Sequence, residues 1–185
     1  MSIAILGWGS LIWDPRELPH YGPWKAGGPV LPIEFSRVSS DCRLTLVIDP
    51  AGSPVTTRYA ISPRSDILDA VEDLRRREAT VRKNIGFIDI ATRKNSRTQF
   101  QEQCDVIEPI SRWCAEQEVT GCVWTALQPN FLVELEVNFS VDEALRFLET
   151  LGKSAREIAL NYIRNAPPEV DTPVRHEVSR RWPVS

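Results

Sequence analysis

Histidine is scarce in this chain of 185 residues, where only His20 and His176 occur. The four cysteines, none of which forms a C-x-x-C pair, are Cys42, Cys104, Cys114 and Cys122. A structural zinc site takes four Cys or His ligands at short spacings, so the sequence does not favour one. Two histidines also weaken the case for a Ser–His or Cys–His catalytic triad. We interpret the cysteines as reduced, half-buried residues of a cytosolic protein.

Long apolar runs and a basic excess are missing as well. No apolar segment approaches the ~20 residues that span a membrane, and no basic segment followed by an apolar run marks a signal peptide. The net charge of -3 gives no electrostatic reason to expect a nucleic acid partner. We therefore expect a cytoplasmic protein with one domain, residues 1–185, and with no membrane or nucleic acid partner. The oligomeric state stays open.

A short apolar run near the start of the chain, Ile3 to Leu6, predicts a strand that ends in the sequence Gly-Trp-Gly-Ser. Gly7 and Gly9 break this strand within three residues, and glycine permits backbone angles that other residues avoid. Such a tight turn can direct successive N–H groups into one concavity, which suits a carboxylate or an oxyanion. The pattern fits a binding loop and a glycine turn packed under two tryptophans about equally well.

The glycine stretch matches three well-known motifs only in part. It opens like a dinucleotide-binding fingerprint, but Ile12 stands where the third glycine belongs. Ile12 also replaces the last glycine of a G-x-S-x-G nucleophile elbow around Ser10. The chain has no Gly-Lys-Ser/Thr phosphate loop. These three functions are not favoured.

Hydrophobic periodicity and turn residues predict the remaining elements. The expected strands are 33–40, 43–48, 55–61, 85–90 and 120–128, with 43–61 forming a hairpin around the turn Asp49-Pro50-Ala51-Gly52. Expected helices span 62–81, 140–151 and 154–166, with capping boxes at Ser140 and Ser154, and 106–118 fits a short helix. The stretch 14–30 is expected to be an ordered loop, 91–103 a loop or irregular edge, and 167–185 a polar tail. Strands with flanking helices and a hairpin indicate the α+β class.

The helix expected over 62–81 carries an acid among its apolar residues. Glu78 lies four residues after Leu74 and three before Val81, so the helical period turns it toward the interior. One interpretation is a general base in a semi-buried pocket. The other is a structural acid, which either lies at the rim of the core or forms an ion pair. The candidate partners for an ion pair are Arg75, Arg76, Arg77 and Arg82.

The arginine run Arg75 to Arg77 also suggests a basic binding patch. However, Asp69, Glu72 and Asp73 precede it at helical pairing distance. A solvated face with salt bridges is therefore the favoured interpretation.

Several of these stretches together resemble the gamma-glutamylcyclotransferase-like superfamily, most closely its glutathione-cleaving branch. The first strand is followed by Gly-Trp-Gly-Ser-Leu-Ile-Trp, similar to the family's Gly-Tyr-Gly-Ser-Leu-Ile-Trp signature. Residues 46–50 are similar to its second-strand hairpin, and Arg77-Glu78 resembles the Arg-Glu pair at the end of its first helix. Gly152-Lys153-Ser154 and Asn161-Tyr162 are similar to its C-terminal motifs. The resemblance extends from about residue 3 to residue 165.

The resemblance implies a mixed β-sheet or small barrel with flanking helices, and an enzyme that needs no metal or organic cofactor. Its substrate would be a small γ-glutamyl compound such as glutathione, a γ-glutamyl amino acid or a γ-glutamyl amine. The α-amine would attack the γ-carbonyl and release 5-oxoproline, with Glu78 as the catalytic acid/base. The residues implied in substrate binding are Gly7, Trp8, Gly9, Ser10, Leu11 and Ile12.

Two departures from the family concern the substrate more than the chemistry. Trp8 stands where the family has Tyr, and Pro129-Asn130-Phe131 stands where the glutathione branch tends to have Asn-Pro-Gln-Tyr. An alternative function is therefore a non-catalytic module that binds a small metabolite or a partner on the same fold.

Overall fold

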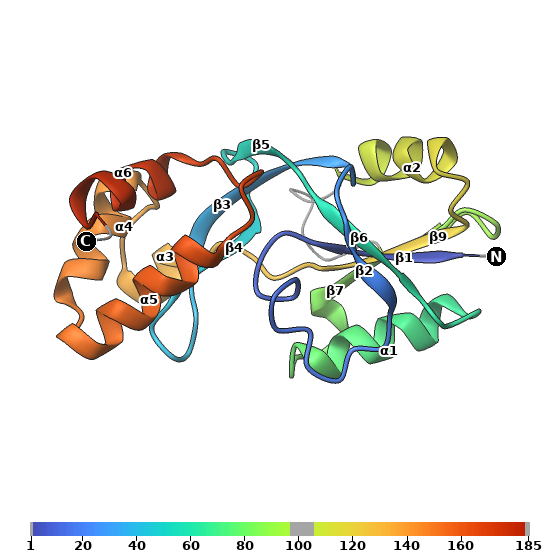
Figure 1. The fold of residues 1–185 in the computed structure, drawn as a ribbon, viewed down its shortest axis with the longest axis horizontal. Helices are drawn as coiled ribbons and strands as arrows, with labels where there is room; N and C mark the ends of the chain where they lie inside the picture. Colours follow the sequence, from blue (N-terminus) through green and yellow to red (C-terminus); the bar gives the residue numbers. More distant parts are fainter. Residues whose placement is uncertain (1, 97–105, 184–185) are drawn as a thin grey trace. The chain divides into compact units, whose positions relative to one another are not determined.

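The computed structural model describes residues 2–96 and 106–183, and its fold is α+β (Figure 1). The chain divides into two compact units, one formed by 1–31 with 56–127 and the other by 32–55 with 128–185. The expectation of one domain over 1–185 stays a prediction. No helix in the described residues is long and apolar enough to cross a membrane.

The first unit is built on a six-stranded mixed sheet. Its strands, in spatial order, are β2 (Tyr21–Lys25), β6 (Arg58–Ser62), β1 (Ile3–Gly7), β9 (Gly121–Thr125), β7 (Ile85–Asp89) and β8 (Lys94–Asn95). The central strand β1 runs antiparallel to β6 and parallel to β9. All five residues of β1 are buried, as expected for a central strand covered on both faces.

Two helices cover opposite faces of this sheet (Figure 1). Helix α1 (Ile67–Arg77) packs Val71 and Leu74 against Ile5 and Val123 in one apolar core. Helix α2 (Ile107–Glu116) lies on the other face, where the thiol of Cys114 contacts that of Cys122 on β9. Burying a side chain of this size contributes about 1.5–3 kcal/mol to folding. These contacts therefore fix α1 on the sheet, and with it the position of the end of α1 relative to the loop after β1.

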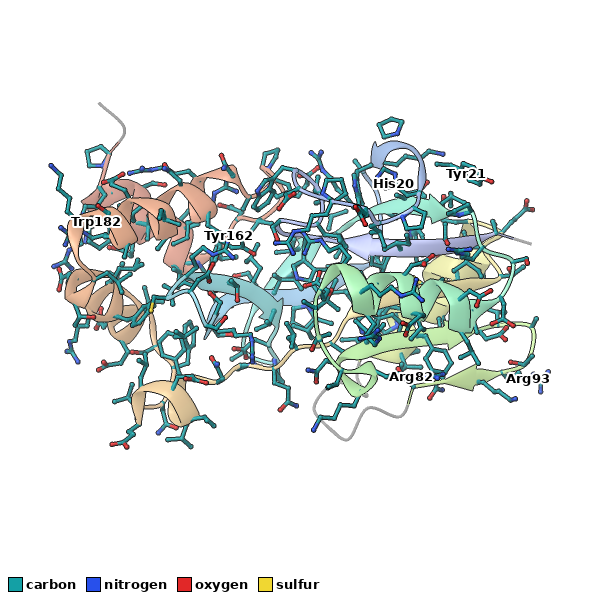
Figure 2. All side chains as sticks on the ribbon, turned by 90° about the horizontal axis from the view of Figure 1, so that it is seen from below. His20, Tyr21, Arg82, Arg93, Tyr162 and Trp182 are labelled. Carbon is teal, nitrogen blue, oxygen red and sulfur yellow. The ribbon has the colours of Figure 1, made fainter. Side chains whose placement is uncertain are left out.

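In the described part of the second unit, a three-stranded sheet packs with four helices. The strands are β3 (Val30–Val38), β4 (Leu44–Ile48) and β5 (Ser53–Thr56), in the order β4-β3-β5. The helices are α3 (Phe131–Leu135), α4 (Val141–Thr150), α5 (Lys153–Asn165) and α6 (Pro173–Arg181). Tyr162, labelled in Figure 2, lies on α5 with its ring edge-on to Phe35 and with the Arg43 guanidinium over its face.

In the second unit, the side chain of Asn130 hydrogen-bonds to the backbone of Val38 on β3. Its side-chain Oδ1 accepts from the Val38 N–H at 2.7 Å, and its Nδ2 donates to the Val38 carbonyl at 2.9 Å. The side chain thereby satisfies both polar groups of a strand residue, as a neighbouring strand would. Asn130 is thus a structural residue in a stretch that departs from the family pattern.

Several sequence expectations are wrong in detail. Neither sheet closes into a barrel within the described residues. The hairpin over 43–61 does not form, because β4 and β5 lie on opposite sides of β3 and β6 joins the other sheet. Helix α1 begins after Asp66, whose Oδ1 accepts from the Leu68 N–H, and not at Ser62. Helix α5 begins after Gly152, so Ser154 is not its N-cap.

Other expectations fit the structure, and some elements were not expected. Strands β1, β4, β7 and β9, and helices α2, α4 and α5, lie where the sequence places them. Ser140 caps α4 through the Glu143 N–H. Strand β2 and helix α6 fall in stretches expected to be loop or tail. Cys42 is exposed, Cys114 and Cys122 are buried, and Cys104 lies outside the described residues.

Glu34 on β3 is a buried carboxylate in the second unit, 3% exposed. Its Oε1 accepts from the Phe35 N–H at 2.7 Å. Burial raises the pKa of Glu34, and the charge of Asp49 adds to the rise, while hydrogen bonds from Phe35, Thr172 and Val174 oppose it. The folded state therefore holds the proton of Glu34 more tightly than the unfolded state does.

A close contact across β7 and β9 gives a test of packing in the first unit. A Cβ added to Gly86 would lie 2.1 Å from a ring atom of the buried Trp124. We expect Gly86→Ala to lower the free energy of unfolding by about 1–3 kcal/mol, the usual cost of overpacking a core. Gly152→Ala, where a Cβ meets nothing within 4 Å, is the control and should change stability little. Equal effects in denaturant titrations would contradict the packing argument.

Glu34 gives a prediction about pH. Because its folded pKa is raised, its favourable contribution is complete below the unfolded pKa of about 4.3 and is lost as pH rises through the folded pKa. Glu34→Gln cannot lose a proton, so its melting temperature should gain on that of the wild type as pH rises from 4 to 7. Glu136→Gln, an exposed carboxylate in the same unit, is the control. A constant difference between Glu34→Gln and wild type across this range would contradict the prediction.

Candidate functional site

In the loop after β1, three backbone N–H groups have no acceptor among the residues that the structure describes. The Ile12 N–H bonds to the Gly9 carbonyl at 3.0 Å, and the Asp14 N–H bonds to the Ser10 carbonyl at 2.8 Å. Within the described residues, the N–H groups of Gly9, Ser10 and Leu11 have no hydrogen-bond acceptor. Successive unpaired amides of this kind suit a carboxylate or an oxyanion.

Neither glycine of this loop is needed for a left-handed backbone. Gly7 and Gly9 are not among the glycines with positive φ, so neither position uses the left-handed region that glycine permits. At Gly7 the constraint is space, because an added Cβ would lie 2.8 Å from the ring of Trp24. The loop is thus shaped by packing, and Trp8 and Leu11 within it are both buried.

Arg77, the last residue of α1, connects this loop to Glu78. Its Nη1 donates to Glu78 Oε1 at 2.9 Å. Its Nη2 donates to the Asp14 carbonyl at 2.6 Å and to Ser10 Oγ at 3.3 Å. The Arg77 and Glu78 side chains are only 5% and 15% exposed. The structure therefore brings the predicted acid and the predicted loop together through one guanidinium.

Glu78 is half-buried, but for a different reason than the helical period suggested. Helix α1 ends at Arg77, and Ala79 adopts a left-handed conformation with φ 49°. The Ala79 N–H bonds to the Arg76 carbonyl and the Thr80 N–H to the Arg75 carbonyl, which is the Schellman ending. Val81 is consequently 54% exposed and does not continue the apolar face. Glu78 turns inward because Arg77 holds it.

Of the partners considered for Glu78, Arg77 is the one that pairs with it. Arg75 and Arg76 both bind Glu72, which agrees with the salt-bridged face expected for the arginine run. Arg82, labelled in Figure 2, is exposed in the short 3-10 helix η1 (Arg82–Asn84). Glu78 Oε1 is therefore occupied, and within the described residues its Oε2 has no hydrogen-bond partner.

The other stretches of the resemblance lie in the second unit. Gly152 is the N-cap of α5, and Tyr162 is buried in that unit beside Phe35. The candidate site residue that the sequence did not single out is Arg77, which entered as a pairing partner, as part of the arginine run and as half of the Arg-Glu motif, but not as a group that binds the loop. Its position directly before Glu78, facing the buried side of an amphipathic helix, was the available signal.

Comparisons with known proteins do not extend this picture: no family model, no curated protein and no solved structure matches the chain. The resemblance to gamma-glutamylcyclotransferases thus depends on the motifs quoted above.

The Arg77–Glu78 pair yields a prediction about coupling. Removing one charge leaves the other partly buried without its counter-charge, so Arg77→Gln and Glu78→Gln should each destabilise the fold. The double variant should be more stable than the sum of the two losses implies, with a coupling energy of about 1–3 kcal/mol. Urea titrations of the four proteins measure it.

A second cycle serves as the control. The exposed pair Arg146 and Glu143 on α4 should couple by less than about 0.5 kcal/mol. A coupling at Arg77–Glu78 as small as this would mean that the buried pair does not organise the site.

Proposed function

We propose that the chain is an enzyme of gamma-glutamylcyclotransferase type, which cleaves a γ-glutamyl amide by intramolecular aminolysis and releases 5-oxoproline. The observation that carries the proposal is the position of Arg77, which contacts both Glu78 and the loop of unpaired amides. A candidate acid/base and a candidate anion cradle thus belong to one connected arrangement. The cytoplasm and a small γ-glutamyl substrate are parts of the same proposal.

The reaction joins two groups of one substrate molecule. The α-amine attacks the γ-carbonyl carbon, a C–N bond closes a five-membered ring, and the bond to the other amine breaks. Holding the substrate in a folded geometry supplies much of the rate, because no second reactant has to be captured. The loop amides of Gly9, Ser10 and Leu11 would hold the α-carboxylate or the developing oxyanion.

Glu78 would move the proton. An α-amine has a pKa near ~8, so much of it is protonated at neutral pH and must lose a proton before it attacks. Glu78 Oε2, which has no partner in the described part of the chain, would accept that proton and return it to the departing nitrogen. Arg77 on Oε1 would fix the orientation of the carboxylate during both transfers.

One observation favours the alternative, a non-catalytic module that binds a small metabolite or a partner. Glu78 pairs with Arg77, as a purely structural acid would. The two functions differ in product, because only the enzyme forms 5-oxoproline. A panel of γ-glutamyl amides with mass-spectrometric detection separates them, and it also names the leaving group, which the Trp8 replacement affects most.

Glu78→Gln is the decisive substitution. It keeps volume and hydrogen-bonding reach but removes the proton acceptor, so 5-oxoproline release should fall by about 10²–10⁴. Because the ion pair is also lost, turnover must be normalised to the folded fraction measured by circular dichroism. The control is Glu72→Gln, which breaks two ion pairs on the same helix and should keep turnover near wild type. A folded Glu78→Gln variant with wild-type turnover would end the catalytic assignment.

A further inference from the structure

The first unit contains a cavity of about 460 Å³ that the proposed reaction does not use. It lies between α1 and the segment after the glycine loop, and six of its lining side chains are charged. They are Arg16, Arg64, Arg76 and Arg77, together with Glu17 and Asp73. Four positive and two negative charges give the lining a net charge of +2.

Each of these arginines keeps N–H groups that no acceptor takes among residues 2–96 and 106–183. Arg64 binds both oxygens of Asp73 through Nε and Nη2, which leaves its Nη1. Arg76 donates through Nε to Glu72, which leaves both of its terminal nitrogens. A guanidinium has five N–H groups, so these pairs use less than half of what the two side chains offer. The ion pairs orient the arginine side chains and still leave N–H donors for a ligand.

Arg77 supplies the most constrained of the free donors. Its Nε is buried and has no acceptor among the described residues. A buried N–H group without an acceptor is costly, so buried N–H groups usually have a hydrogen-bond partner. Arg16 lies against it, since Arg16 Nη1 donates to the Arg77 carbonyl.

We propose that this cavity binds a phosphate group, either free or as the monoester of a small molecule. A carboxylate is satisfied by the fork of one guanidinium, as Asp73 already is by Arg64. A phosphate dianion has three acceptor oxygens and two charges, which match several free guanidinium edges and a lining charge of +2. The cavity is larger than one phosphate, so it leaves room for the organic part of an ester.

Such a site would be connected to the candidate active site through Arg77. The same guanidinium lines the cavity and holds Glu78 Oε1 and Ser10 Oγ. A phosphate in the cavity would share the positive charge of the Arg77 guanidinium, which now faces Glu78. The phosphate site itself does not depend on the proposed cyclotransferase activity.

Isothermal titration calorimetry tests the proposal on the full-length chain. Inorganic phosphate and glycerol 3-phosphate are titrated separately at pH 7.5, with sodium chloride adjusted to hold the ionic strength constant. We expect saturable 1:1 binding of at least one of them, and the stronger binder tells free phosphate from an ester. The variant Arg16→Gln/Arg76→Gln should bind at least tenfold more weakly, because two of the four cations are lost while the Arg64–Asp73 and Arg77–Glu78 pairs remain.

The matched control is Arg146→Gln in the other unit. Arg146 is 68% exposed and pairs with an acid on its own helix, much as Arg76 is 66% exposed and pairs with Glu72. The Arg146→Gln variant should bind phosphate with the same affinity as the wild type. Circular dichroism establishes that each variant is folded before titration. No saturable binding of either probe by the wild type would overturn the proposal, and so would equal affinity in the folded double variant.

Discussion

The desolvation of one guanidinium organises the first unit. The Arg77 side chain ends in a guanidinium, and burying such a group is tolerable only if polar groups surround it. The Glu78 carboxylate, the Asp14 carbonyl and the Ser10 hydroxyl provide them. These three groups come from the end of α1 and from the loop after β1. Because one buried guanidinium needs all of these hydrogen-bond acceptors, it fixes the positions of the loop, the end of α1 and Glu78 relative to one another.

This constraint explains why the candidate site could be found in the sequence, though by an incomplete argument. The adjacency of Arg77 and Glu78 and the glycine loop are visible as motifs. That Glu78 is turned inward was inferred from an apolar face continuing to Val81, and the Schellman ending at Ala79 breaks that face. An alanine in a left-handed conformation leaves no trace in a sequence, since glycine is the residue that marks such endings.

In the fold, too, hydrophobic periodicity predicts where strands lie in the sequence but not which strands pair. Strands β1, β7 and β9 could be predicted because they are continuous apolar runs between turn residues. The partner of a strand cannot be read in this way, so the turn at Asp49 suggested a hairpin whereas the following strand β5 pairs on the far side of β3. Helix α6 buries only Val174 and Val178, a pattern too sparse to stand out, although Thr172 and Pro173 form a good helix start.

The chain passes between the two units three times, after residues 31, 55 and 127. Consequently, a ribosome releases the segment 32–55, which holds β4 and most of β3 and β5, long before the helices of 128–185 that complete its unit. The apolar faces of these strands lack their packing partners while about seventy further residues are synthesised. During that time the first unit gains its last strand, β9. Neither unit is one contiguous segment of the chain. During synthesis, the sheet of the second unit therefore has to wait for the last-made part of the protein before it can pack.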